Sequence, residues 1–212
     1  MIVHRFMTKN PVFVAPDVSV SDARNLMRKE RIGCLPVLDK SNGLVGIVTK
    51  KNLLKAGPTA ATTLDMYEIS YLLSKLKVEK IMERDVVTVN DDELLEEAAR
   101  VMADGDISCL PVMRGKVLVG VITVRDVFHA FLNALGARHQ GVRISFSMEE
   151  KPGQLAKLTA AIAEKGGNIV AFVSQDGDDL TERRGTLKIS GIDAATVELI
   201  AQSVGARLLD IR

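Results

Sequence analysis

Two stretches of the sequence repeat each other, Ile32-Gly33-Cys34-Leu35-Pro36-Val37-Leu38 and Ile107-Ser108-Cys109-Leu110-Pro111-Val112-Met113. Each is followed by a second apolar run, Gly46-Ile47-Val48-Thr49 in the first copy and Gly120-Val121-Ile122-Thr123 in the second. The Cys-Leu-Pro-Val cores lie 75 residues apart, and Met7 with Met82 and Ala23 with Ala98 show the same offset. A match of this length, with one deletion, indicates a duplicated structural unit.

Each copy is predicted to form two strands and the start of a helix. The proline of Leu-Pro-Val cannot donate a ladder hydrogen bond, so it is expected in a strand's first residues or on an edge. The segments 41–43 and 114–116 carry glycine-containing turns between apolar runs, which is typical of hairpins. Thr49 and Thr123 then stand where a helix N-cap is expected.

This arrangement has the chemistry of a nucleotide site. A helix start that follows a strand presents free N–H groups and the positive end of the helix dipole, which suits a phosphate. Asp126 lies three residues after Thr123 and so on the same helix face, where a carboxylate can accept hydrogen bonds from ribose hydroxyls. The alternative is a capped helix with an ordinary surface aspartate.

The pattern, apolar-x-x-Leu-Pro-Val followed by Gly-[Ile/Val]-[Ile/Val]-Thr-x-x-[Asp/Asn], occurs twice and resembles the tandem CBS-domain pair, or Bateman module. The resemblance covers about residues 1–135. It implies an α/β (α+β) fold in which two βαββα units pack about a pseudo-two-fold axis. It also implies two clefts between the units, each combining the Leu-Pro strand of one with the Thr-x-x-Asp of the other, which hold adenosine ligands.

Carried onto this chain, the resemblance predicts two sets of ligand-binding residues. The first set, called here the Asp126 cleft, is Asn10, Ala15, Ile32, Gly33, Cys34, Pro36, Val121, Thr123, Arg125 and Asp126. The second set, called the Asn52 cleft, is Asp85, Asn90, Ile107, Ser108, Cys109, Pro111, Ile47, Thr49, Lys51 and Asn52. Asn52 departs from the family pattern, in which an aspartate is usual. An amide is neutral and offers one acceptor oxygen, so we expect the Asp126 cleft to bind more tightly and the Asn52 cleft to be weak or empty.

The predicted domain order is CBS domain 1 over 1–60, a linker over 61–80, CBS domain 2 over 81–136 and a third domain over 141–212. Apolar spacing predicts an extra helix over 65–77 in the linker. With Tyr67-Glu68-Ile69 and Leu72-Leu73, this insertion resembles the acetoin-utilisation regulatory protein branch of CBS proteins, and it equally fits a linker helix that packs on the module. In the second repeat, Asp91 or Asp92 is expected to cap a helix that runs to Ala103.

The last 70 residues show a strand–helix–strand–strand–helix–strand order, which is the ferredoxin-like arrangement. With Pro152-Gly153-Gln154-Leu155 before the first helix and Gly167-Asn168-Ile169 after it, the segment resembles an ACT domain. In that family the loop before the first helix often binds an amino acid at a dimer interface. The matching positions are Glu149, Glu150, Lys151, Pro152, Gly153, Gln154, Leu155, Asn168 and Ile169. The alternative is that this domain only pairs with its copy in another chain.

Composition limits the partners. The net charge is +1 and aromatic residues make up 4% of the chain, so neither an electrostatic field nor stacking platforms for nucleic acid are expected. No run approaches the roughly 20 apolar residues that span a bilayer. We predict a cytoplasmic location and no membrane partner. Cys34 and Cys109 are the two cysteines, and we interpret them as small buried thiols rather than as a disulfide or metal pair.

Catalysis is not predicted. His4, His129 and His139 lie far apart, and the sequence shows no metal-ligand spacing and no Walker or dinucleotide motif. The sequence therefore favours a regulatory sensor without cofactor that binds AMP, ADP, ATP or S-adenosylmethionine in the CBS clefts. The ACT domain adds a candidate amino-acid site, and action through a homodimer is expected. The alternative is a constitutive scaffold or regulatory subunit of a partner enzyme with degenerate clefts.

Overall fold

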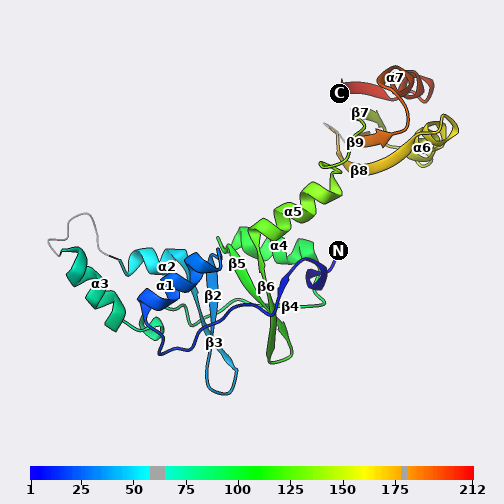
Figure 1. The fold of residues 1–212 in the computed structure, drawn as a ribbon. Helices are drawn as coiled ribbons and strands as arrows, with labels where there is room; N and C mark the ends of the chain where they lie inside the picture. The colour runs from blue at the N-terminus through cyan, green and yellow to red at the C-terminus, as the bar shows by residue number, and fades with distance from the viewer. Residues whose placement is uncertain (58–64, 178–180) are drawn as a thin grey trace. The chain divides into compact units, whose positions relative to one another are not determined.

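The computed structural model describes residues 1–57, 65–177 and 181–212 (Figure 1). Residues 61–64 of the predicted linker lie outside the described residues. Its internal contacts divide the chain into units of residues 1–127 and 128–212. The division falls within helix α5 (Val124–Ala134), and within the second unit a Cβ atom on Gly136 would lie 3.1 Å from side chains of Val170 and Ala171. The two units are described separately below.

The first repeat forms a helix, a hairpin and a short helix in the predicted order: α1 (Val20–Lys29), β2 (Cys34–Leu38), β3 (Leu44–Thr49) and α2 (Lys50–Lys55). Ser19 caps α1 by accepting from the N–H of Asp22. The hairpin turn is held by the Asp39 carboxylate, which accepts from two turn amides. The apolar faces of these elements enclose one core, formed by Val14, Ala23, Met27, Leu35, Val37, Val48 and Val78.

The second repeat has the same order: β4 (Val89–Asn90), α4 (Leu95–Asp104), β5 (Cys109–Arg114), β6 (Val117–Thr123) and α5. Both hairpins are antiparallel, and Cys34 faces Thr49 as Cys109 faces Thr123. Pro36 and Pro111 occupy the third position of their strands. Pro111 lies just before the stretch of β5 that pairs with β4, where its missing N–H removes no bond to that strand.

The linker contains the predicted extra helix, α3 (Met66–Lys75), which lies against α1. Asp65 caps it by accepting from the backbone N–H groups of Tyr67 and Glu68, and the Glu68 side chain accepts from the Asp65 N–H in return. This reciprocal capping box satisfies N–H groups that a helix start otherwise leaves without partners. A short 3-10 turn, η2 (Val78–Lys80), follows α3.

The two repeats exchange their leading segments. The N-terminal segment, η1 (Val3–Arg5) and β1 (Thr8–Lys9), precedes the first repeat but pairs with β6 of the second. The segment after α3 precedes the second repeat but pairs with the first, where Glu83 and Ile47 exchange two backbone hydrogen bonds of 2.9 Å. The isolated bridges Ile2–Leu94 and Ser19–Lys77 follow the same exchange. Neither repeat completes its pairing alone.

A glycine in each repeat makes this exchange possible. A Cβ atom on Gly46 would lie 2.5 Å from the Met82 sulfur and 3.0 Å from the Glu83 carbonyl oxygen. The equivalent Gly120 meets Met7 and Thr8 at 2.4 and 3.0 Å. The leading segments cross the strands too closely for a side chain at these two positions.

Our interpretation of the cysteines as free thiols was wrong. Cys34 and Cys109 form a disulfide, with Cα atoms 6.7 Å apart. The pseudo-symmetry brings the equivalent strand starts together, and both cysteines lie in one small buried cluster with Ile47 and Val121. Sequence spacing could not reveal this pairing, because two residues on equivalent strands meet only if the symmetry axis passes between them.

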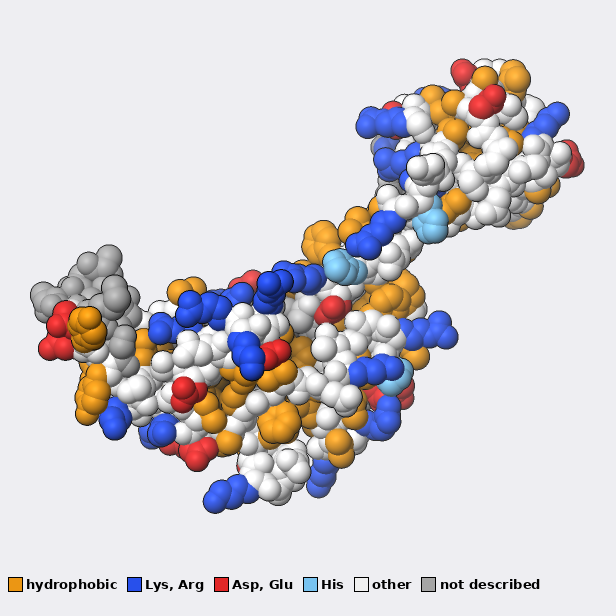
Figure 2. All heavy atoms as spheres, in the orientation of Figure 1, with side chains coloured by type: hydrophobic (Ala, Val, Ile, Leu, Met, Phe, Trp, Pro, Cys, Tyr) orange, Lys and Arg blue, Asp and Glu red, His pale blue; other side chains and the backbone are white. Residues whose placement is uncertain are grey.

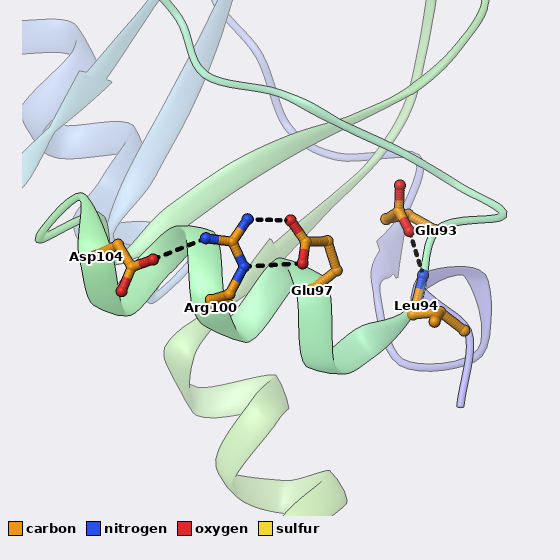
Figure 3. Close-up of polar contacts among 5 residues, drawn as sticks. All are labelled: Glu93, Leu94, Glu97, Arg100 and Asp104. Carbon is orange, nitrogen blue, oxygen red and sulfur yellow. Dashed lines mark hydrogen bonds and ion pairs between the residues drawn. The ribbon is translucent and has the colours of Figure 1, made fainter.

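The predicted cap of the second repeat's helix was also wrong. The N-cap of α4 is Leu94, without a side-chain cap, and its backbone N–H donates to the Glu93 carboxylate (Figure 3). Asp91 instead accepts from the Arg114 guanidinium at 3.0 Å. One turn into α4, Arg100 bonds Glu97 and Asp104, and its hydrogen bond to Glu97 holds the pKa of that carboxyl below its ordinary value.

The second unit has the predicted ferredoxin-like fold. Its elements are β7 (Val142–Glu149), α6 (Gln154–Glu164), β8 (Asn168–Asp176), β9 (Glu182–Ser190), α7 (Ala194–Ser203) and β10 (Arg207–Ile211). The strands form one antiparallel sheet in the order β10-β7-β9-β8. Asp193 caps α7 by accepting from the backbone N–H of Thr196. Residues of the sheet and both helices share one core, centred on Phe146, Leu158, Ile162 and Leu187.

The disulfide is expected to stabilise the first unit. It closes a loop with a sequence separation of 75, for which the chain-entropy estimate is about 4 kcal/mol. We expect Cys34→Ala/Cys109→Ala to lower the urea midpoint of unfolding accordingly. The wild type in reducing buffer serves as the matched control and should unfold at nearly the same urea concentration as the variant. Identical midpoints for oxidised and reduced wild type would contradict the bond.

The Asp91–Arg114 pair predicts a pH dependence. The hydrogen bond from Arg114 lowers the pKa of Asp91, followed by smaller charge effects of Arg114 and His4. Because the folded pKa lies below the unfolded one, the pair stabilises the fold above the ordinary carboxyl pKa, and this contribution is lost as pH falls through the folded pKa. In Arg114→Met, carboxyl-carbon NMR titration should show the Asp91 pKa raised toward its ordinary value. An unchanged titration midpoint would rule out Arg114 as the cause.

Candidate functional site

A cavity of about 460 Å³ lies between the two repeats at the Asn52 cleft. Its wall from the first repeat is the end of β3 and the start of α2, and its wall from the second is the segment between α4 and β5. The residues that the sequence predicted here and that line the cavity are Ile47, Thr49, Lys51, Asn52, Asp85, Ile107, Ser108 and Cys109. The structure therefore brings together most of this set from two distant parts of the chain.

Two members of the predicted Asn52 set do not line this cavity. Asn90 is in β4, where its Cα partner is Met113. Pro111 is buried in β5 opposite Val121. Both positions follow the 75-residue offset between the repeats. This offset shows which residues are equivalent, but it does not show which side chains reach a cavity.

Other lining residues are not in the predicted Asn52 set. They are Lys50, Lys55, Glu83, Val86, Val87, Gly105, Asp106 and Gly33, of which Gly33 was assigned to the Asp126 cleft. The offset that relates Met7 to Met82 relates Thr8 to Glu83, and this was the signal that could have pointed to Glu83. It gains meaning only once the leading segments are known to exchange.

Thr49, Asn52 and Glu83 form a hydrogen-bonded chain at the cavity. The Asn52 side-chain oxygen accepts from the Thr49 N–H at 2.8 Å and from the Thr49 hydroxyl at 2.6 Å. Its amide nitrogen donates to Glu83 Oε1 at 2.9 Å. Asn52 is buried, and every bond it makes has a partner that the fold already holds in place. Its amide is therefore fixed in one orientation.

The equivalent residues of the second repeat, Thr123 and Asp126, form the first half of the same hydrogen-bonded arrangement. Asp126 Oδ2 accepts from the Thr123 N–H at 2.8 Å and from its hydroxyl at 2.7 Å. Within the ranges that the structure describes, Oδ1 of Asp126 accepts no hydrogen bond. Asp126 is half-buried, and its Oδ1 therefore retains its acceptor capacity.

The remaining residues predicted for the Asp126 cleft have separate places. Cys34 is in the disulfide, Val121 joins its cluster, and Ile32 packs on the core of the first repeat. Pro36 is buried in β2 and its carbonyl accepts from Val14. Arg125 is exposed on α5, Asn10 is exposed with φ of 50°, and Ala15 lines a second cavity beside α1. Membership of the Asp126 cleft stays a prediction for this set.

The Asn52 cavity has a mixed polar and apolar lining. Ile47, Val86 and Ile107 supply apolar surface suited to a flat aromatic base. Three exposed lysines of α2, Lys50, Lys51 and Lys55, stand at its edge, and Figure 2 shows basic side chains gathered over this helix. Lys51 forms an exposed ion pair of 3.5 Å with Asp106 across the cavity. The lysines favour an anionic group on the ligand.

The predicted amino-acid site of the second unit begins at the end of β7. Glu149 and Lys151 form an ion pair there, and Glu150 pairs with Arg183 of β9, which lowers the pKa of Glu150 through their hydrogen bond. Gly153 adopts φ of 88° at the start of α6, a conformation that favours glycine. Pro152 is exposed and Gln154 half-buried; Leu155 is exposed, and Asn168 and Ile169 open β8 at the sheet edge.

Two further features bear on chemistry. Among the described residues, no three His, Cys, Asp or Glu side chains are grouped as a metal site. No helix in the described ranges has both the length and the apolar character needed to cross a lipid bilayer.

The sequence models of known families agree with this architecture. The model of the CBS domain matches residues 3–58 and 78–133, which together exceed half of the chain. The chain therefore belongs to the CBS domain family and carries a tandem CBS pair. Residues 140–212 match the TTHA0829-like ACT domain, so an ACT domain follows the pair.

Solved structures similar to the CBS pair include three informative ones. The acetoin utilization protein AcuB from Vibrio cholerae is 31% identical, with a TM-score of 0.54 over 65% of this chain and 95% of that one. CBSX2 in complex with AMP is 34% identical, with a TM-score of 0.51 over 62% and 96%. The CBS pair of MJ0100 with 5′-methylthioadenosine and S-adenosylmethionine is 28% identical, with a TM-score of 0.52 over 62% and 99%.

Curated relatives are mostly longer than the matched region. The Methanocaldococcus jannaschii protein MJ1404 is 34% identical over 128 residues, which are 59% of this chain and 30% of that protein. The inosine-5′-monophosphate dehydrogenase of Korarchaeum cryptofilum is 31% identical over 140 residues, which are 66% of this chain and 26% of that enzyme. The match thus spans less than a third of either relative.

The hydrogen-bonded chain predicts a local stability effect. Asn52→Ala removes the partner of the Thr49 N–H and hydroxyl and leaves the Glu83 carboxylate without its amide donor. We expect a loss of about 1–2 kcal/mol in the free energy of unfolding by urea denaturation. Lys51→Ala on the exposed face of the same helix is the control and should change stability by less than about 0.5 kcal/mol. Equal values for the two variants would contradict the role of Asn52.

Proposed function

We propose that this chain is a non-catalytic regulatory protein that binds an adenine nucleotide, AMP, ADP or ATP, or S-adenosylmethionine, in the clefts of its CBS pair. The observation that carries the proposal is the cavity between the repeats, in which Thr49, Asn52 and Glu83 meet Ile107 and Ser108 of the other repeat. Membership of the CBS family adds support. A ligand there contacts both repeats at once and so couples its binding to their arrangement.

The cavity's chemistry matches the parts of a nucleotide. The apolar side chains of Ile47, Val86 and Ile107 suit the base, and the polar chain of Thr49, Asn52 and Glu83 suits the ribose hydroxyls. The lysines of α2 suit a phosphate, which favours a phosphorylated ligand over bare adenosine.

The similar structures support the same ligand class. CBSX2 was crystallised with AMP, and the MJ0100 CBS pair with 5′-methylthioadenosine and S-adenosylmethionine. All three compounds share an adenosine-type nucleoside and differ in the group at the 5′ position. The lysines at the cavity edge therefore favour AMP-like over sulfonium ligands in this chain.

A regulatory rather than catalytic role fits the relatives. The match to inosine-5′-monophosphate dehydrogenase covers 26% of that enzyme, so its activity does not transfer to this chain. The AcuB protein from Vibrio cholerae is covered over 95% of its length, which supports assignment to the acetoin-utilisation branch. We also propose a cytoplasmic location. The Cys34–Cys109 bond is an observation against this location, because disulfides are rare in the reducing cytosol.

We further propose that the protein acts as a homodimer and that its ACT domain takes part. β8 is an edge strand of the ACT sheet and exposes Phe172 and Val173, so its free backbone groups suit pairing with a second copy. The loop from Lys151 to Leu155 is the candidate amino-acid site, in accord with the ACT family match. The alternative for this domain is pairing alone.

The central test is ligand binding to the full chain. Calorimetric titration with AMP, ADP, ATP and S-adenosylmethionine should show binding by at least one, and a ligand at 100 times its Kd should add about 2.7 kcal/mol of stability in thermal unfolding. Asp126→Ala should remove the binding contributed by the Asp126 cleft and leave that of the Asn52 cleft. Lys157→Ala in the ACT domain is the control variant.

The same experiment separates the proposal from the scaffold alternative. If no adenine compound binds the wild type or raises its melting temperature, the clefts are degenerate, and the protein is better described as a scaffold or subunit of a partner enzyme.

A further inference from the structure

The two clefts differ in where they carry a carboxylate. In the register that relates the repeats, Asn52 is equivalent to Asp126 and Glu83 is equivalent to Thr8. In the second repeat the helix carries the acid, Asp126, and the leading segment that pairs with this repeat carries the neutral Thr8. In the first repeat the helix carries the neutral Asn52, and the leading segment that pairs with it carries the acid, Glu83.

The backbone geometry shows that the compared positions are structurally equivalent. Glu83 pairs with Ile47, and Thr8 pairs with Val121 at the equivalent strand position. Asn52 and Asp126 make the same two hydrogen bonds to Thr49 and Thr123. The side chains at the two positions differ, Asn52 and Glu83 in one case and Asp126 and Thr8 in the other, so one carboxylate stands beside each threonine-capped helix.

Glu83 is held where its carboxylate can act on a ligand. Its backbone is fixed by two hydrogen bonds to Ile47, and Oε1 accepts from the buried Asn52 amide. Both residues line the 460 Å³ cavity. Glu83 is exposed, and within the described part of the chain its Oε2 accepts no hydrogen bond.

We infer that Glu83 accepts the ribose hydroxyls of a ligand in the Asn52 cleft, and that Asn52 acts as a positioning residue that orients its carboxylate. This inference rests on the proposed nucleotide function. It replaces the expectation that the Asn52 cleft is weak because an aspartate is missing there, since the missing negative charge is present on the exchanged segment. The two clefts then bind the same sugar through acids on different elements.

The inference and simple electrostatics predict opposite changes in nucleotide affinity when the charge of Glu83 is removed. Removing a negative charge from a cavity edged by three lysines should tighten binding of an anionic nucleotide if Glu83 only contributes to the field. If Glu83 accepts from the ribose, the same change removes a charge-assisted hydrogen bond and weakens binding. The direction of the change therefore distinguishes the two roles.

The experiment compares AMP and 2′-deoxy-AMP by calorimetric titration of the full chain in an Asp126→Ala background, which isolates the Asn52 cleft. Glu83→Gln preserves shape and an acceptor for the Asn52 amide, so it should fold normally, as circular dichroism melting checks. We expect it to weaken AMP binding about tenfold and 2′-deoxy-AMP binding by less, because 2′-deoxy-AMP lacks one of the two hydroxyls that Glu83 accepts from. Glu30→Gln, which removes an exposed carboxylate away from the cavity, is the matched control and should change neither.

An exchange variant provides the second arm. Asn52→Asp with Glu83→Gln moves the carboxylate to the helix position that it has in the other repeat. AMP affinity should then return to within about threefold of that of the parent, which is the Asp126→Ala variant. Asn52→Asp alone places two carboxylates in contact and should weaken binding by their repulsion.

The outcomes separate this inference from the proposed function. If the parent binds AMP but Glu83→Gln binds it equally well or more tightly, the inference is overturned and the nucleotide function stands. If the wild type and the parent bind no adenine compound, the proposed function fails and the role of Glu83 fails with it.

Discussion

The first unit depends on the exchange of leading segments between the two repeats. Backbone hydrogen bonds join Glu83 to Ile47 of the first repeat, and Thr8 pairs with Val121 of the second. Each of these segments precedes one repeat in the chain and completes the strand pairing of the other. Buried backbone groups need such partners, so the repeats cannot separate without exposing strand edges. The pseudo-symmetric pair is consequently one folding unit and not two linked domains.

The cavity follows from the same exchange. The crossing at Gly46 brings the leading segment across the end of β3, next to the start of α2, and so brings Glu83 to Asn52. Apolar side chains of Ile47, Val86 and Ile107 also line this cavity. A ligand in this space contacts elements that are held to each other by strand pairing, by packing and by the disulfide. Binding can then alter the relative stability of their arrangements only through contacts made differently in each.

The symmetry constrains backbone and core much more strongly than it constrains the polar residues. Glycine is kept at 46 and 120, where a Cβ would collide with methionine, and cysteine is kept at 34 and 109, where the axis brings the residues together. Asn52 and Asp126 need only offer an oxygen to the capping threonine, which either side chain does. The position of the acid could therefore shift between two nearby elements while the fold stayed the same.

The sequence by itself determined the duplication, the order of elements in both repeats and the ferredoxin-like order of the last domain, because these depend on local signals. The capping threonine Thr49, the turn at Asn42 and Gly43, and the apolar spacing of α3 each act over a few residues. The same reasoning failed at α4, where Asp91 had a tertiary partner in Arg114 that competed with the cap.

Only the tertiary structure decided which residues meet across the repeats. The pairing of Cys34 with Cys109 and the contact of Asn52 with Glu83 join positions far apart in the chain, and no local pattern encodes either. Both arise because a symmetry axis and a strand exchange fix distances that sequence separation leaves open. Eight of the residues predicted for the Asn52 cleft line its cavity, but Glu83, the acid beside Asn52, was identified only from the folded structure.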